Sequence, residues 1–199
     1  MQIGGIASGK STVAEVLKSK PNVQLISGDL LGHATYVPGG PAYQPLVDAF
    51  GTTIVDVATG TIDRKALGGI VFGNPDKLQQ LNGIVWPAIR LLAQQKIAEI
   101  KSSQQQQPTV VVFEAAVLVE AGWTDLCQEV WCVSVSEDTA STRLQARNKI
   151  SQEDALKRIR SQLSNTERER AATRVISNEG SQDALLASID VLWSAFTAK

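Results

Sequence analysis

The stretch GGIASGKST at residues 4–12 constrains this chain more than any other feature of its sequence. It satisfies the pattern G-x-x-x-x-G-K-[ST] with Gly4, Gly9, Lys10 and Ser11. In this pattern the glycines let backbone N–H groups turn toward one point, the lysine reaches the outer phosphates of a nucleotide, and the hydroxyl group ligates Mg²⁺. The motif therefore predicts a nucleotide-binding α/β domain in which a strand leads into the loop and a helix leaves it.

Few residues precede the loop. Only Met1, Gln2 and Ile3 stand before the first glycine, where a buried strand of about five residues is expected. We interpret Met1 as a truncated or internally initiated start, with the first strand clipped. A clipped central strand loses ladder hydrogen bonds and buried apolar surface, so we expect a lower stability than a full strand would give. Restoring about four apolar residues before Gln2 is expected to raise the melting temperature.

Four apolar runs further along the chain predict the other strands of a sheet. They read NVQLIS, TVVVF, EVWCVSV and RVIS, and helical patterns that start at or beside Lys10, Ser136, Ser151 and Ser181 alternate with them. Runs that are apolar at nearly every position are typical of parallel strands with helices on both faces. The sequence therefore predicts an α/β fold, a P-loop three-layer sandwich with a parallel sheet.

Residues 30–103 follow a different pattern, in which helices are punctuated by Pro and Gly. We interpret this stretch as an inserted helical substrate-binding lobe. Its helices are expected to begin at or beside Pro45, Asp63, Asn74 and Pro87. The expected division is a nucleotide-binding core at 1–29 and 108–199 with a short lid at about 142–165, the lobe at 30–103, and a Gln-rich exposed connection at 104–107.

The composition argues against several other kinds of function. A formal net charge of -1 leaves no basic field that would hold nucleic acid by bulk electrostatics. The longest apolar runs fall well short of the roughly twenty residues that a membrane span needs. Because Cys127 and Cys132 lie five positions apart and His33 is the only histidine, we expect reduced thiols and no zinc site. These features predict a cytoplasmic protein and leave attachment to an organelle surface open.

Two predicted strands end beside a carboxylate, Asp29 after VQLISG and Glu114 after VVVF. The carboxyl ends of parallel strands meet at one edge of a sheet, where ligand sites of α/β proteins lie. One of the two acids would orient or deprotonate an attacking hydroxyl group, while the other would help to hold Mg²⁺ beside the Ser11 hydroxyl. The plainer alternative for each is a capping or solvated acid.

Arginines are expected to meet the charge on a moving phosphoryl group, because their planar fork binds two oxygens at once. Arg143 and Arg147 are four residues apart and therefore share one face of a helix. Five more arginines follow, and we expect most of them to be solvated, as arginines on exposed helices usually are; they are Arg158, Arg160, Arg168, Arg170 and Arg174. Asn178, in the turn after RVIS, would present its amide to a purine base or belong to an ordinary turn.

Three classes of function fit these features to different degrees. A small-molecule kinase accounts for the loop, the strand-end acids, the arginine pair and the separate lobe. A regulatory GTPase would need N-K-x-D after a strand, but the nearest match, residues 148–151, lacks the Asp. The third class is a non-catalytic module. One form of it would be a scaffold whose glycine loop has no function, and such a scaffold would bind no nucleotide. Among the enzymes, a nucleoside monophosphate kinase is the alternative.

Six segments give the chain a family resemblance. They read GGIASGKST, SGDLLGHATYVPGGPAYQPLVDAFG, IDRKALGGIVFGN, IVWPAI, EAAVLVEAGW and ISNEGS. On these segments the chain resembles dephospho-coenzyme A kinase, and more closely the kinase domain of the animal-type bifunctional coenzyme A synthase. The resemblance implies Mg²⁺-dependent transfer of the ATP γ-phosphoryl group to the ribose 3′-hydroxyl of dephospho-coenzyme A, the last step in making coenzyme A. It also raises the possibility of a fused domain before Met1.

The resemblance implies roles for individual residues. Asp29 matches the family's catalytic base, and Lys10, Arg143 and Arg147 complete the expected catalytic set. The expected ATP-binding residues are Gly5, Ala7, Ser8, Gly9, Lys10, Ser11, Thr12 and Asn178. The expected acceptor-side residues are His33, Arg64 and Glu120, and the lobe would be the acceptor-binding domain.

The chain departs from the family pattern at four positions. Ser27 stands where an Asp is usual, Ala7 replaces a common glycine, Asn148 stands for an Asp, and Glu114 for an Asp. If the position of Ala7 requires a positive φ, its methyl group restricts the backbone. None of the four removes a group that the chemistry requires, so we expect effects on nucleotide affinity and rate rather than on the reaction class.

Overall fold

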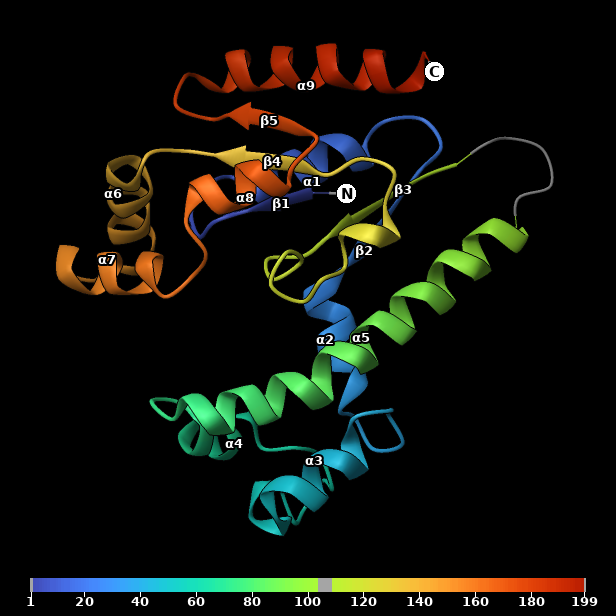
Figure 1. Cartoon of the computed structure of the whole chain (residues 1–199), viewed down its shortest axis with the longest axis vertical. Helices are drawn as coiled ribbons and strands as arrows, with labels where there is room; N and C mark the ends of the chain where they lie inside the picture. Colours follow the sequence, from blue (N-terminus) through green and yellow to red (C-terminus); the bar gives the residue numbers. More distant parts are fainter. Residues whose placement is uncertain (1, 104–108, 199) are drawn as a thin grey trace. The chain divides into compact units, whose positions relative to one another are not determined.

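The computed structural model describes residues 2–103 and 109–198. The chain divides into two units, and Figure 1 labels their helices and strands. The first unit comprises residues 1–26 and 104–199, and the second comprises residues 27–103. The expected core segment ended at Asp29, whereas Asp29 belongs to the second unit. The Gln-rich connection predicted at 104–107 lies outside the described residues.

Within the described ranges, the first unit is built around a five-stranded sheet with the strand order β2-β3-β1-β4-β5. Its strands are β1 (Gln2–Gly4), β2 (Val23–Ser27), β3 (Val110–Glu114), β4 (Trp131–Ser134) and β5 (Arg174–Ser177). β1 pairs in parallel with β3 and β4, and β4 pairs in parallel with β5. Although β1 has only three residues, it is the central strand, and its Ile3 is 1% exposed. The predicted parallel sheet is confirmed.

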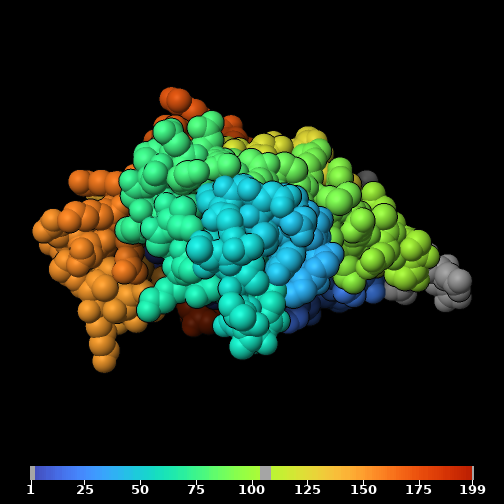
Figure 2. All heavy atoms as spheres, turned by 90° about the horizontal axis from the view of Figure 1, so that it is seen from below, coloured from blue at the N-terminus to red at the C-terminus, as the bar shows by residue number. Residues whose placement is uncertain are grey.

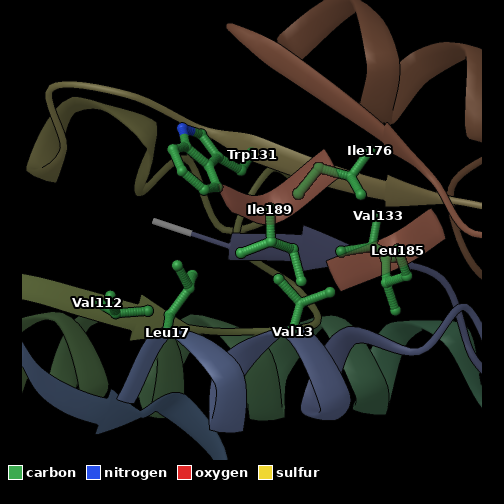
Figure 3. Packing of buried hydrophobic residues seen from close by; sticks show 8 residues of the cluster. All are labelled: Val13, Leu17, Val112, Trp131, Val133, Ile176, Leu185 and Ile189. Carbon is green, nitrogen blue, oxygen red and sulfur yellow. The ribbon is translucent and has the colours of Figure 1, made fainter. Parts of the chain in front are cut away.

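Helices cover both faces of this sheet. Those that pack on its strands are α1 (Lys10–Lys18), on β1 and β3, α8 (Asn165–Ala171), on β1 and β4, and α9 (Gln182–Thr197), on β5. The first unit also contains α6 (Glu137–Asn148) and α7 (Gln152–Arg160), which pack on each other. The side chains of α1 and α9 meet those of β3, β4 and β5 in one hydrophobic core (Figure 3). That core consists of Val13, Leu17, Val112, Trp131, Val133, Ile176, Leu185 and Ile189.

The side chains of β4 show that α8 lies on the face of the sheet opposite to α1 and α9. Successive side chains of a strand point to opposite sides of the sheet. Trp131 and Val133 belong to the core beneath α1 and α9. The hydroxyl group of Ser134 instead donates a hydrogen bond to Glu169 of α8 at 2.6 Å. The sheet therefore lies between two helical layers, and the predicted three-layer arrangement is confirmed.

Serine caps start the helices that the sequence predicted in the second half of the chain. Ser136, Ser151 and Ser181 are the N-caps of α6, α7 and α9, and each side chain accepts a hydrogen bond from a backbone N–H three residues on. Such bonds satisfy N–H groups that have no partner inside the helix. These helix starts are therefore local properties of the sequence.

The second unit is helical, as expected. Its helices are α2 (Gly28–Thr35), α3 (Tyr43–Phe50), α4 (Arg64–Val71) and α5 (Pro75–Ser103). The carboxylate of Asp63 caps α4, accepting hydrogen bonds from the backbone N–H groups of Lys65 and Ala66. Figure 2 shows the atoms of α3, α4 and α5, in cyan to green, at the surface of this unit. Its core consists of Ala42, Leu46, Ile54, Ile62, Leu67, Val71 and Ala88.

The helix α5 corrects the sequence prediction. A new helix was expected near Pro87, but α5 runs through this proline without a break. Pro87 has no N–H to bond the carbonyl group of Gly83, so one backbone hydrogen bond is lost there. Apolar residues on both sides of the proline pack into the same core and keep the two halves together: Leu81, Ile84, Val85 and Ala88. Neither α5 nor any other helix in the described ranges is long and apolar enough to span a membrane.

Candidate active site

The phosphate loop, residues 5–9, connects β1 to α1. Gly9, the N-cap of α1, has φ 93°, a left-handed conformation that glycine adopts without steric cost. A Cβ atom at Gly9 would collide with the side-chain amide of Asn178, and one at Gly4 would lie 2.8 Å from the carbonyl oxygen of Val133. Close contacts therefore favour glycine at both positions, and the turn requires it at Gly9.

The loop and the arginine pair line one pocket of about 230 Å³. Its lining residues are Gly5, Ala7, Ser8, Gly9, Lys10, Ser11, Thr12, Arg143 and Arg147. The N-terminus of α1 carries the positive end of a helix dipole and has no acidic residue in its first turn. A pocket with a helix N-terminus, a lysine and two arginines is suited to a polyphosphate. The structure thus brings together the loop and the arginines that the sequence predicted as a site.

Oxygen donors for a cation lie beside the lysine of the loop. Ser11 Oγ lies 3.3 Å from Oε1 of Glu114, which ends β3, and Lys10 Nζ lies 3.5 Å from the same oxygen. Hydroxyl and carboxylate oxygens are ligands that Mg²⁺ accepts, and it usually takes one or two carboxylates together with phosphate oxygens and water. Among the described residues, no group of three or more His, Cys, Asp and Glu side chains could hold a metal ion. The donor set therefore fits Mg²⁺ that arrives with a nucleotide.

Asn178 is bound to the loop itself. Its side chain is buried, and Nδ2 donates a hydrogen bond to the carbonyl oxygen of Ser8 at 2.8 Å. Its own carbonyl oxygen accepts a hydrogen bond from Nη2 of Arg143 at 2.8 Å. Asn178 thus links the loop to an arginine of the pocket, a role that the sequence did not indicate. The predicted contact of its amide with a purine base stays a prediction.

Ala7 has the positive φ at which its methyl group restricts the backbone. Its φ is 60°, in the left-handed region. For a residue with a Cβ atom this region costs roughly 1–2 kcal/mol. The position that a glycine commonly occupies in the family therefore does require a positive φ, and Ala7 carries strain within the phosphate loop.

Two residues that contact the loop, Gln162 and Arg168, gave no signal in the sequence. The N–H of Ile6 donates to Gln162 Oε1 at 2.9 Å, and Arg168 Nη2 donates to the same oxygen at 3.4 Å. Most of the later arginines were expected to be solvated, but Arg168 is 3% exposed. The expectation fails for Arg168 because α8, which carries it, packs against β1 and β4.

Glu120 is the charged neighbour of Arg168. Its Oε1 atom lies 3.9 Å from Arg168 Nη2. Glu120 Oε2, Arg168 Nε and Ser8 Oγ are buried atoms without a hydrogen-bond partner among the described residues. Glu120 was expected on the acceptor side; it lies beside Arg168, an arginine of its own unit.

The remaining acceptor-side residues lie in the second unit. Asp29 is exposed in the first turn of α2, and His33 is exposed in its last turn. The ring of His33 meets that of Tyr36 edge-on at 6.1 Å. Burial raises the pKa of Tyr36, and the nearby charge of Arg64 partly opposes this. The structure therefore places His33 and Arg64 around Tyr36, which the sequence reasoning had not singled out.

Comparison with known proteins adds the family. A model of the dephospho-CoA kinase family matches residues 2–184, which is most of the chain. The chain belongs to the dephospho-CoA kinase family. A dephospho-CoA kinase of Geobacter metallireducens is 39% identical over 190 residues, covering 96% of this chain and 92% of the relative. One from Carboxydothermus hydrogenoformans is 42% identical over 178 residues, covering 89% of this chain and 84% of the relative.

Solved structures agree with the fold of this dephospho-CoA kinase family member. A crystal structure of a Thermus thermophilus protein matches with a TM-score of 0.77 at 28% identity, over 98% of this chain and 95% of that one. A dephospho-CoA kinase from Campylobacter jejuni matches with a TM-score of 0.69 at 24% identity, over 98% and 94% of the two chains. The second likeness concerns the fold alone. The α/β kinase fold and the family inferred from sequence are both confirmed.

Proposed function

We propose that this chain transfers the γ-phosphoryl group of ATP to the ribose 3′-hydroxyl of dephospho-coenzyme A and so forms coenzyme A. The observation that carries the proposal is the pocket in which the phosphate loop, Arg143 and Arg147 come together in a member of the dephospho-CoA kinase family. Phosphoryl transfer depends mainly on positioning and on charge stabilisation, and this pocket offers groups for both.

The residues of the pocket would act on ATP. Backbone N–H groups of the loop and the N-terminus of α1 hold the phosphate oxygens, and Lys10 reaches the outer phosphates. Arg143 and Arg147 meet the charge that is spread over the transferred group. Arg143 is also tied to the carbonyl oxygen of Asn178, which keeps its guanidinium beside the loop.

We assign Mg²⁺ as the cofactor and Ser11 with Glu114 as its protein ligands. The bound ion supplies positive charge that neutralises phosphate oxygens. The single carboxylate of Glu114 suits an ion that takes its other ligands from the nucleotide and from water. Lys10 Nζ lies 3.5 Å from Oε1 of Glu114 and holds this carboxylate beside the phosphate loop.

We assign the acceptor to the helical unit. Asp29 would act as the general base: it takes the proton of the 3′-hydroxyl group as that oxygen bonds to the γ-phosphorus, and the bond to the β-phosphate oxygen breaks to release ADP. His33 and Arg64, which flank Tyr36, would contact the acceptor, and Arg64 is suited to its phosphate groups. Glu120 would complete this set.

Three finer assignments belong to the same proposal. Residues from about 142 to 165, with the end of α6 and all of α7, would form a lid that closes on ATP and excludes water. The enzyme would work in the cytoplasm. Its likeness to the kinase domain of the animal-type bifunctional coenzyme A synthase stays a prediction, because the relatives compared above are bacterial dephospho-CoA kinases.

The proposal is tested by an ADP-release assay with Mg²⁺ and ATP, run with dephospho-coenzyme A, adenosine, AMP and shikimate as separate acceptors. ADP release with dephospho-coenzyme A, together with chromatographic identification of coenzyme A, is the expected result. Signal with AMP alone would instead identify a nucleoside monophosphate kinase. The absence of any binding of a fluorescent ATP analogue would identify a scaffold with an idle loop.

A further inference from the structure

The backbone N–H of Ile6, in the first half of the phosphate loop, donates a hydrogen bond to Oε1 of Gln162 at 2.9 Å. Gln162 follows the end of α7 and lies 156 positions further along the chain. Gly5 and Ala7, the neighbours of Ile6, both line the phosphate pocket. We propose that Gln162 is a positioning residue for nucleotide binding, which orients the segment from Gly5 to Ala7 toward the phosphates.

The oxygen of Gln162 is itself held in place. Arg168 Nη2 donates to it at 3.4 Å, and Arg168 is 3% exposed. A Cβ atom at Gly5 would lie 3.1 Å from Nη1 of the same guanidinium, so the arginine also contacts the backbone of the loop directly. Gln162 and Arg168 therefore form one support beneath the first half of the loop.

The charge of Arg168 is balanced inside this support. A buried guanidinium without a counter-charge is strongly unfavourable. Glu120 Oε1 lies 3.9 Å from Arg168 Nη2 and supplies that charge. Gln162 is neutral and needs no counter-charge, and its Oε1 atom accepts hydrogen bonds from both Arg168 and Ile6, which links the arginine to the loop.

The loop needs such support because its own residues hold it poorly. Glycines have wide conformational freedom, and Ala7 has an unfavourable φ of 60°. Asn178 holds the second half of the loop at the carbonyl oxygen of Ser8. Gln162 holds the first half at Ile6, so two side chains from distant segments fix the peptide groups before a phosphate arrives. Groups that are already in place cost no reorganisation when the ligand binds.

The surroundings of Gln162 allow it to be replaced without disturbing the hydrophobic core. Gln162 borders a second pocket of about 290 Å³ on this side of the loop, with Gly5, Ser8, Asn165 and Arg168 also in its lining. Gln162 does not belong to the core cluster of the first unit. A leucine there removes the acceptor oxygen at nearly unchanged size, and a glutamate keeps an oxygen in its place.

The test compares Gln162→Leu and Gln162→Glu with the parent protein and with a control, Gln128→Leu. Gln128 is exposed, lies shortly before β4 and is outside the proposed lid. Three quantities are measured for each protein: the Kd of a fluorescent ATP analogue with Mg²⁺, the melting temperature, and the exchange rate of the Ile6 amide without nucleotide. The last readout reports the proposed hydrogen bond directly.

We expect Gln162→Leu to weaken nucleotide binding by about tenfold and to speed exchange of the Ile6 amide by a similar factor, the size of effect of one hydrogen bond. Gln162→Glu should retain the Ile6 protection, and Gln128→Leu should match the parent in all three quantities. The melting temperatures of all four proteins should agree within a few degrees.

Several outcomes would overturn the proposal. An unprotected Ile6 amide in the parent protein refutes the hydrogen bond without any variant. In Gln162→Leu, nucleotide affinity within twofold of the parent, or a loss of affinity matched by general destabilisation, refutes the positioning role. The proposal rests on the proposed function in one respect, that the loop binds ATP. A parent protein that binds no ATP refutes that function, whereas equal affinity in parent and variant refutes only the role of Gln162.

Discussion

The side-chain amide of Asn178 donates a hydrogen bond to the carbonyl oxygen of Ser8 at 2.8 Å, although the two residues are 170 positions apart in sequence. The same contact explains why Gly9 has no room for a side chain. The turn after the last strand of the sheet is therefore part of the phosphate loop's structure.

Asn178→Ala should lower the free energy of unfolding by about 1–3 kcal/mol, because it leaves the buried carbonyl oxygen of Ser8 without a donor. Asn178→Asp should cost more than alanine, since a carboxylate would then face that carbonyl oxygen. Urea denaturation measures both. Asn148→Ala, an exposed residue at the end of α6, is the control and should stay within about 0.5 kcal/mol of the parent. Equal stability of Asn178→Ala and the parent would refute the support that we assign to this contact.

Lys10→Ala should abolish measurable turnover, with a loss of at least about a hundredfold in kcat, because charge on the outer phosphates is no longer met. The ADP-release assay measures it. Lys18→Ala, at the other end of α1 and exposed beside Glu15, is the matched control and should keep the parent rate. Comparable rates in the two variants would contradict a phosphate-contacting role for Lys10.

Asp29→Asn should leave ATP affinity unchanged and reduce kcat by about 10²–10⁴-fold, the usual contribution of a general base. Separate measurements of ATP binding and of ADP release distinguish the two effects. Asp48→Asn, an exposed residue of α3 in the same unit, should behave like the parent. Turnover of Asp29→Asn at the parent rate would disprove the base assignment.

Ala7→Gly should raise the free energy of unfolding by about 0.5–1 kcal/mol, because glycine relieves the strain at φ 60° while making the unfolded chain only slightly more flexible. Urea denaturation of the nucleotide-free protein measures the change. Ala146→Gly in the exposed face of α6 should shift the stability in the opposite direction by about 1 kcal/mol. A less stable Ala7→Gly would show that the loop compensates the strain elsewhere.

Acid should destabilise the fold through the turn that carries Asn178. The pKa of Glu179 lies below its ordinary value of 4.5, because its carboxylate accepts hydrogen bonds from the Thr139 hydroxyl and from the backbone N–H of Ser136. A lowered pKa in the folded state stabilises the fold above the ordinary value, and that stabilisation is lost as the pH falls through the folded-state pKa. The melting temperature should therefore be level from about pH 7 to 5 and fall below about pH 4.5.

Glu179→Gln isolates that contribution. Glutamine does not titrate, so the variant has no carboxylate whose stabilising effect is lost on protonation. Its melting temperature should therefore fall less steeply with acid than that of the parent. Thermal melts between about pH 7 and 3 measure the difference. Parallel curves for the two proteins would contradict a stabilising role for the Glu179 carboxylate.

Much of the fold could be predicted because its signals are local. The loop motif occupies consecutive residues, so its turn and the helix after it follow from glycine chemistry and a helix N-terminus. The caps Asp63, Ser136 and Ser151 act within three residues of themselves. One exception among the helices is α5, where burial on both sides of Pro87 overrode the local break that proline favours.

The support of the site was decided by tertiary structure. The sequence by itself determined a phosphate-binding loop, a parallel sheet between helices, an arginine pair on one helix and the dephospho-CoA kinase family. Only the folded chain brought Gln162 to Ile6, Asn178 to Ser8 and Arg168 out of solvent, because the strand order places segments more than 150 residues apart beside one loop. The sequence does not reveal whether the amide of a Gln or Asn, or the guanidinium of an Arg, will hydrogen-bond to water or to a buried backbone group. Only tertiary packing decides which of these partners it has.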